Sequence, residues 1–311
     1  MHYSVLLQES LSALSINADG FYVDGTFGRG GHSGEVLKLL SENGRLMAFD
    51  KDAAAISFGQ EKFANDKRLL LQHASFADMK SVLDEHGMLG KVDGILLDLG
   101  VSSPQLDEAD RGFSFLRDGP LDMRMDNTSG QTVAEWLAVA EQWEIKKVLH
   151  VYGEEKFAAL IAKKIVERRE EQPFVRTLDL ANFIEAIIPK KVQMKSNKHA
   201  ATRSFQALRI HINKELEDLE NLLADVLLML KPGGRLAVIS FHSLEDRIVK
   251  HYIREQERGP QLPRNIPIID MKRDAHIKSV GKAIKASIDE LDENVRSRSA
   301  IFRIAEKVAA T

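Results

Sequence analysis

A glycine-rich turn near the N-terminus is the first stretch whose residue types could do chemistry. The run from Phe21 to His32 reads F-Y-V-D-G-T-F-G-R-G-G-H, and the residues after it carry the apolar spacing of a helix. Glycines in a strand-to-helix turn let a ligand approach the backbone and the positive helix N-terminus. The turn therefore suits a nucleotide-like cofactor. Its glycines do not match the G-x-G-x-x-G dinucleotide spacing, so plain turn chemistry stays open.

The second candidate is an acid at the end of the next predicted strand. The run Gly44 to Asp50 reads G-R-L-M-A-F-D, so Asp50 ends an apolar run about 20 residues past the glycines. Dinucleotide-binding folds place at this point the carboxylate that binds ribose hydroxyls. The structural alternative is a helix N-cap for the segment after Asp52. The order of strand, glycine turn, helix, strand and acid favours the cofactor site.

The third candidate is Asp98, which ends the apolar run 92–98 and opens a polar loop that continues to Gln105. An uninterrupted apolar run is typical of a parallel strand that is covered on both faces. Because parallel strands end at the same edge of a sheet, the three strand ends predict one ligand site. Phe76 follows a further predicted strand, and it could stack on a flat ligand or pack in the core.

This layout serves two enzyme classes, nicotinamide dehydrogenases and methyltransferases that use S-adenosylmethionine. A K-P-G-G ending of a helix and a late strand that could pair antiparallel, near residues 300–305, favour the second class. A non-enzymatic RNA-binding module is the third hypothesis. Methylation of cytosine at C5 needs a cysteine thiolate, and the chain has no cysteine. An exocyclic amine needs mainly alignment with the methyl donor and exclusion of water.

Acceptors for the amine hydrogens are available in the loop after residue 98. Asp98 supplies a carboxylate and Ser103 a hydroxyl, although Ser-Ser-Pro is also a common turn. His242 follows the strand 235–240 and could act as a base, contact RNA or cap the next helix. We expect the segment from Glu245 to Arg247 to form a surface ion pair. No metal site is expected, since the absence of cysteine removes thiolate ligands.

The composition is that of a globular protein, with 311 residues, 44% of them hydrophobic and 29% charged. No apolar run approaches the roughly 18 residues of a membrane span, and the first 14 residues lack a basic leader region, so we expect a cytoplasmic protein. The net charge of -3 argues against a globally basic nucleic-acid binder. Between Pro189 and Lys214, however, seven Lys or Arg residues occur without an acid. Such a run could contact RNA phosphates or simply be solvated.

The sequence pattern predicts an α/β domain that is interrupted by an inserted helical segment. Alternating strand and helix patterns occupy residues 1–106 and resume over 199–311, and they form one discontinuous domain. Residues 107–198 are predicted to form an inserted all-helical subdomain, which includes a helix over 132–151. A long helical pattern then runs over 204–230 and stops at the K-P-G-G sequence.

Eight sequence blocks carry a resemblance that covers the chain essentially from end to end. The chain resembles the MraW (RsmH) family of bacterial small-subunit ribosomal RNA cytosine-N4 methyltransferases. The blocks are H-Y-S-V-L-L from His2, D-G-T-F-G-R-G-G-H-S from Asp24, D-G-I-L-L-D-L-G-V-S-S-P-Q from Asp93, R-G-F-S-F from Arg111, G-P-L-D-M-R-M from Gly119, A-T-R-S-F-Q-A-L-R-I from Ala201, S-F-H-S-L-E-D-R from Ser240 and R-S-R-S-A from Arg296.

The resemblance implies a class I S-adenosylmethionine-dependent methyltransferase sheet, Rossmann-like in its winding, with a helical insertion. It implies N4 methylation of a cytidine in the decoding region of 16S rRNA, by direct in-line transfer without a covalent intermediate. The implied partner is 16S rRNA within the small ribosomal subunit, and a homodimer is left open. The implied contacts to S-adenosyl-L-methionine fall on Gly30, Gly31, His32, Asp50, Phe76, Asp98 and Gln105.

The same resemblance makes the insertion and the basic run the RNA-docking side of the protein. The candidate RNA contacts there are Lys195, Lys198 and Arg203. The candidates for catalysis are Asp98, Ser103 and His242, and the resemblance does not decide which group receives the amine proton.

Overall fold

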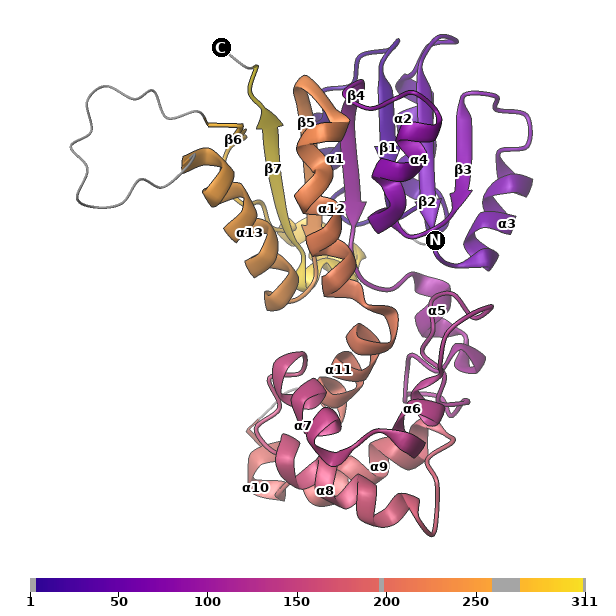
Figure 1. Cartoon of the computed structure of the whole chain (residues 1–311), viewed down its shortest axis with the longest axis vertical. Helices are drawn as coiled ribbons and strands as arrows, with labels where there is room; N and C mark the ends of the chain where they lie inside the picture. The colour runs from indigo at the N-terminus through magenta and orange to yellow at the C-terminus, as the bar shows by residue number, and fades with distance from the viewer. Residues whose placement is uncertain (1–3, 196–198, 259–274, 310–311) are drawn as a thin grey trace, which may run out of the picture. The chain divides into compact units, whose positions relative to one another are not determined.

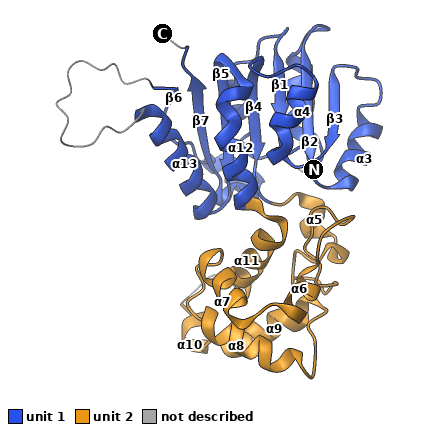
Figure 2. Ribbon diagram, in the orientation of Figure 1, with its two compact units in different colours: residues 1–100, 216–311 blue, residues 101–215 orange. Residues whose placement is uncertain are grey.

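The computed structural model describes residues 4–195, 199–258 and 275–309 (Figure 1). The chain divides into two compact units, of which unit 1 comprises residues 1–100 and 216–311 and unit 2 comprises residues 101–215 (Figure 2). No described helix is long and apolar enough to cross a membrane.

The described residues of unit 1 form a seven-stranded sheet in the order β3-β2-β1-β4-β5-β7-β6. Strands β1 to β5 are parallel, whereas β7 runs antiparallel to both of its neighbours, as the sequence predicts for the late strand. This mixed sheet confirms the predicted class I methyltransferase fold. The strands are β1 (Phe21–Asp24), β2 (Arg45–Asp50), β3 (Leu69–His73), β4 (Val92–Asp98), β5 (Leu230–Ser240), β6 (Ile277–Ser279) and β7 (Ile301–Lys307).

Both faces of the sheet are covered by helices, because its strands are apolar on both sides. Side chains alternate between the two faces along a strand. In β4, Ile95 and Leu97 join a core that includes residues of α4, α12 and α13, whereas Leu96 joins a second core with residues of α1 and α2. The helices of unit 1 are α1 (Leu7–Leu14), α2 (Gly31–Leu39), α3 (Ala53–Lys62), α4 (Met79–Glu85), α12 (Glu215–Met229), α13 (Ser243–Arg258) and α14 (Ile288–Glu293).

Unit 2 is a separate helical body with its own core. Leu137, Ile145, Ile161, Ile184 and Leu208 come from five different helices and are all at most 1% exposed. This packing explains the amphipathic spacing seen in the sequence. The helices are α5 (Ser103–Asp107), α6 (Val133–Val139), α7 (Gln142–Val151), α8 (Ala158–Arg169), α9 (Thr177–Ile187), α10 (Lys190–Gln193) and α11 (Thr202–Asn213).

Two helices predicted as continuous are each broken, so both predictions were wrong. The pattern over 204–230 divides at Lys214, which has a left-handed φ of 52° and separates α11 from α12. The pattern over 132–151 divides at Ala140, whose extended backbone separates α6 from α7. A capping box formed by Glu141 then starts α7. Apolar spacing continues through both breaks, so periodicity alone does not reveal them.

Candidate active site

The strand-to-helix turn predicted from its glycines is present between β1 and α2. Gly28 and Gly30 have φ angles of 54° and 64°, in the left-handed region that glycine tolerates best. A Cβ at Gly30 would lie 2.7 Å from the Phe27 ring, so the turn is also too tightly packed there for a side chain. At Gly28 an added Cβ would meet no described atom within 4 Å. A ligand can therefore approach the backbone of the turn at Gly28.

Asp50, at the end of β2, holds this turn in place. Its Oδ2 atom accepts a hydrogen bond from Gly28 N at 2.7 Å, and its Oδ1 atom accepts one from Asp52 N at 2.8 Å. The N-cap of α3 is Asp52, whose carboxylate accepts from Ala54 N, so the capping role does not belong to Asp50. Burial raises the pKa of Asp50 to about 6 against the opposing effect of these two hydrogen bonds. Each carboxylate oxygen keeps a lone pair for a ligand hydroxyl.

Asp98, at the end of β4, faces His32 in the first turn of α2. The Oδ2 atom of Asp98 lies 3.7 Å from Nδ1 of His32, and Nε2 of the same ring lies 3.0 Å from the carbonyl oxygen of Val5. The Oδ1 atom of Asp98 is buried and has no hydrogen-bond partner among the described residues. Burial raises the pKa of Asp98 to about 6, and although His32 acts in the opposite direction, Asp24 and Glu245 add to the rise.

Asp24 is a positioning residue that sequence reasoning did not single out. It is 3% exposed, and its carboxylate accepts hydrogen bonds from Thr26 N at 3.0 Å and from Ser33 Oγ at 2.6 Å. Thr26 Oγ1 in turn accepts a hydrogen bond from Asp98 N at 2.7 Å. The ends of β1 and β4 and the start of α2 are thereby fixed to one another. The available signal was a carboxylate at the end of the first strand, directly before the glycines.

Phe76 lies beside the same turn, in a short 3-10 helix that follows β3. A Cβ added at Gly25 would lie 3.2 Å from the Cβ of Phe76, and the Phe76 side chain is partly buried against the sheet core. Ser75 caps the 3-10 helix by accepting from Ala77 N, and it donates to Asp218 at 2.7 Å. Phe76 therefore borders the glycine turn and also packs in the core, so its two sequence interpretations do not exclude each other.

His242, at the end of β5, is turned toward a buried acid. Its Nε2 atom lies 3.1 Å from Oε1 of Glu245, which is 2% exposed. The other carboxylate oxygen of Glu245 accepts from the backbone N–H groups of Phe241 and His242, at 2.8 and 3.3 Å. The expectation that Glu245 lies in a surface ion pair is therefore wrong, because its carboxylate is buried and accepts from the backbone directly before α13. The Nδ1 atom of His242 accepts a hydrogen bond from Glu245 N at 3.4 Å, and this contact favours the capping interpretation of His242.

The remaining predicted residues belong to unit 2. Ser103 is the first residue of α5, and Gln105 is 4% exposed and forms a capping box with Ser102, in which Ser102 N donates to Gln105 Oε1 at 2.9 Å. Lys195 and Arg203 are exposed. Lys198 lies outside the residues that the structure describes. In unit 1, by contrast, His32, Asp50, Phe76 and Asp98 all border the glycine turn or are hydrogen-bonded to it through Thr26.

A protein-family model described as the MraW methylase family matches residues 1–308. A protein of Pseudoalteromonas atlantica named ribosomal RNA small subunit methyltransferase H is 53% identical over 309 residues, which are 99% of this chain and 98% of that protein. The protein of the same name from Legionella pneumophila strain Paris is 54% identical over 308 residues, 99% of either chain. A solved rRNA methylase of Streptococcus thermophilus is 10% identical, covers 99% of this chain and 100% of its own, and has a TM-score of 0.44.

Proposed function

Because this chain belongs to the MraW methylase family, we propose that it transfers a methyl group from S-adenosyl-L-methionine to N4 of a cytidine in the decoding region of 16S rRNA. Relatives more than half identical along the whole chain are named as methyltransferases of small-subunit ribosomal RNA. The observation that carries the proposed chemistry is the buried Oδ1 atom of Asp98, which has no partner among the described residues and lies next to the glycine turn.

The residues around the turn fit the methyl donor. The open space beside Gly28 lets a ligand approach the turn, and the start of α2, which has no side-chain cap, presents backbone N–H groups to it. We assign the ribose hydroxyls to Asp50, whose carboxylate keeps free lone pairs, and the adenine face to Phe76. Gly30, Gly31, His32 and Asp98 lie next to these groups, whereas Gln105 is assigned to the donor by the family resemblance alone.

The proposed reaction needs no covalent intermediate with the enzyme. The cofactor supplies a methyl group on a positively charged sulfur, which is already a good electrophile. As the bond from N4 to the methyl carbon forms, the bond from that carbon to sulfur breaks and its electron pair stays on sulfur. The enzyme has to align the three atoms, exclude water and accept one amine proton. With no cysteine in the chain, thiolate addition to the ring has no candidate residue.

We assign acceptance of the amine proton to Asp98. A carboxyl with a pKa of about 6 is largely ionised at neutral pH, yet it still binds a proton well enough to act as a general base. His32 faces the same carboxyl, with its Nδ1 atom 3.7 Å from Oδ2, and its charge opposes the rise in the Asp98 pKa. His242 is assigned a positioning role through Glu245, and Ser103 is kept as a candidate acceptor from the loop.

We assign RNA contacts to unit 2. Lys195 and Arg203 are exposed cations of the basic run. Helix α7 adds a surface that sequence reasoning missed, where Trp143 is 63% exposed and Lys146 and Lys147 are exposed at the i+3 and i+4 positions. An exposed aromatic ring beside two cations can stack on an unpaired base while the lysines contact phosphates.

The proposed function is tested by transfer of a labelled methyl group from S-adenosyl-L-methionine to 16S rRNA that lacks the modification. Naked rRNA and assembled small subunits are offered separately, because the partner is expected to be the rRNA within the subunit. We expect the wild-type chain to label one of the two substrates and the Asp98→Asn variant to label it at a rate lower by about 100-fold or more. Labelling by the variant at the wild-type rate would exclude Asp98 as the proton acceptor.

A further inference from the structure

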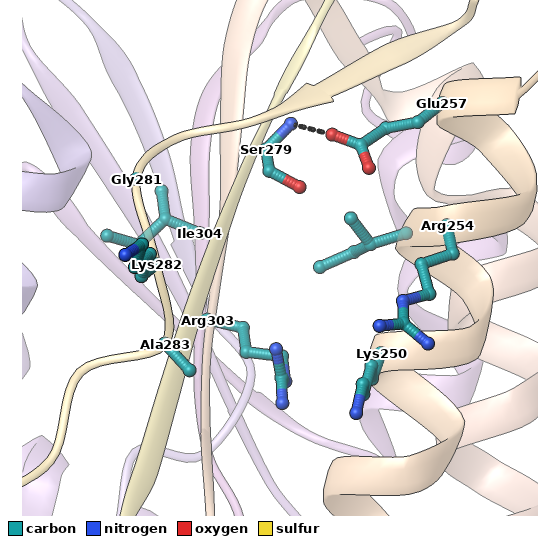
Figure 3. A pocket seen from close by; sticks show the side chains of 10 residues that line it. Lys250, Arg254, Glu257, Ser279, Gly281, Lys282, Ala283, Arg303 and Ile304 are labelled. Carbon is teal, nitrogen blue, oxygen red and sulfur yellow. Dashed lines mark hydrogen bonds between the residues drawn. The ribbon is translucent and has the colours of Figure 1, made fainter.

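A small cavity lies apart from the glycine turn, between α13 and the antiparallel strands β6 and β7 (Figure 3). Its volume is about 120 Å³, and none of its lining residues belongs to the predicted cofactor site. Lys250, Arg254 and Glu257 line it from α13, and Arg303 lines it from β7. The segment that follows β6 completes the wall.

The cavity is strongly cationic. Figure 3 shows the side chains of Lys250, Arg254 and Arg303 extending toward a common space from two different elements. Lys282 adds a fourth cationic residue at the wall. Glu257 is the single acid among the lining residues, and its carboxylate accepts a hydrogen bond from Ser279 N at 2.5 Å, which joins it to the end of β6.

One of these cations is held rigidly in place. Arg303 donates two hydrogen bonds to Asp246, from Nε at 2.7 Å and from an Nη at 3.1 Å, so this pair offsets its own charge and fixes the guanidinium plane. Lys250, Arg254 and Lys282 have no hydrogen-bond or ion-pair partner among the described residues. The cavity therefore concentrates positive charge that the described part of the protein does not neutralise.

The size and charge of the cavity restrict what could occupy it. Sites for whole drug-sized or nucleotide ligands commonly span roughly 300 to 1,000 Å³, several times this volume. A space of about 120 Å³ suits a single small anionic group. Lysine and arginine side chains that converge from different elements are the usual ligands of a phosphate, with arginine supplying paired N–H donors.

We propose that this cavity binds a phosphate group. The phosphate belongs either to the backbone of an RNA strand or to a free phosphate ion, since both present the same tetrahedral anion. The alternative in which the phosphate belongs to RNA rests on the proposed function, whereas the alternative of a free phosphate ion does not. In the first case the site anchors the substrate on unit 1 through residues that do not contact the methyl donor.

The test compares two cations on the same helix. Arg254 lines the cavity, whereas Arg258, one helical turn further along α13, is exposed and is not among the lining residues. Arg254→Gln and Lys250→Gln are therefore the test variants, and Arg258→Gln is the matched control that removes the same charge. All three are measured in the full chain for binding of inorganic phosphate and of a 16S-derived RNA fragment over a series of salt concentrations.

We expect each test variant to weaken binding at least fivefold in one of the two assays and the control to leave both unchanged. If RNA is the source, each lost phosphate contact also lowers the slope of log affinity against log salt by about 1. Loss of inorganic phosphate binding with unchanged RNA binding would identify the free ion. Test variants that match Arg258→Gln in both assays would overturn the proposal.

Failure of the phosphate site and failure of the proposed function are separable in this design. Affinity for S-adenosyl-L-methionine is measured for each variant and is expected to stay at the wild-type value. A wild-type chain that binds phosphate in the cavity but transfers no methyl group to rRNA would contradict the proposed function and leave the site intact.

Discussion

The Nδ1 atom of His32 lies 3.7 Å from the Oδ2 atom of Asp98, while the opposite nitrogen of the ring lies 3.0 Å from the carbonyl oxygen of Val5. A carbonyl oxygen can only accept, so Nε2 carries a hydrogen and Nδ1 is the ring nitrogen that faces the carboxyl. A separation of 3.7 Å is too long for a hydrogen bond, so His32 acts on Asp98 through its charge, which opposes the rise in the Asp98 pKa. We assign acceptance of the amine proton to Asp98 itself.

The raised pKa of Asp98 should make the rate of methyl transfer depend on pH. Since the pKa of Asp98 is raised to about 6, the carboxyl is protonated and inactive as an acceptor well below pH 6, and it is ionised above it. We expect kcat to rise with pH through this range and to level off above about pH 7. Asp98→Asn should lower kcat by about 100-fold or more and remove this rise. A wild-type kcat that stays constant from about pH 5 to about pH 8 would count against Asp98 as the proton acceptor.

The same substitution should stabilise the fold, and the effect should depend on pH. The folded-state pKa of Asp98 is raised, so the folded chain holds its proton more tightly than the unfolded chain, whose aspartate pKa is about 3.9. Stability is therefore lost as the pH rises from about 4 to 6, and the penalty stays in full above that range. Asp98→Asn should gain on the order of 1 to 3 kcal/mol at pH 7.5 and little near pH 4, measured by denaturant unfolding. An equal difference at both pH values would contradict this account.

Asp50 should matter for donor binding, and its neighbour Asp52 provides the control. Removing a charged acceptor of the ribose hydroxyls, which also holds Gly28 N, should weaken binding of S-adenosyl-L-methionine by about 1.5 to 3 kcal/mol in Asp50→Ala. Asp52→Ala removes the N-cap of α3 and should cost about 1 kcal/mol of stability without the same loss of affinity. Isothermal calorimetry distinguishes the two, and equal affinities for both variants would contradict the ribose assignment.

Much of unit 1 could be predicted because its signals are local. The apolar run of β4 ends at Asp98, and an acid at the end of a buried parallel strand is visible in the sequence. The burial of Glu245 was not predictable in the same way, because it depends on how α13 packs after β5. The break at Lys214 was also missed, since a left-handed lysine leaves no mark in the apolar spacing.

The exposed face of α7 predicts a specific effect on RNA binding. Trp143→Ala should weaken binding of single-stranded 16S fragments by about 1 to 3 kcal/mol, because the base loses its stacking partner, whereas Trp143→Phe should retain most of the affinity.

Lys195→Gln combined with Arg203→Gln should reduce the salt dependence of RNA binding and leave donor affinity unchanged. Filter binding at several salt concentrations measures both effects. If Trp143→Ala binds RNA as the wild type does, α7 is not part of the RNA surface.

The identity of the methylated nucleoside decides whether the chain methylates N4 of a cytidine in 16S rRNA. Small subunits that lack the modification are incubated with the wild-type chain and labelled S-adenosyl-L-methionine, and the rRNA is digested and its nucleosides separated. We expect the label to be found in N4-methylcytidine. Label in 5-methylcytidine or in a methylated purine nucleoside, or no label in the rRNA at all, would contradict it.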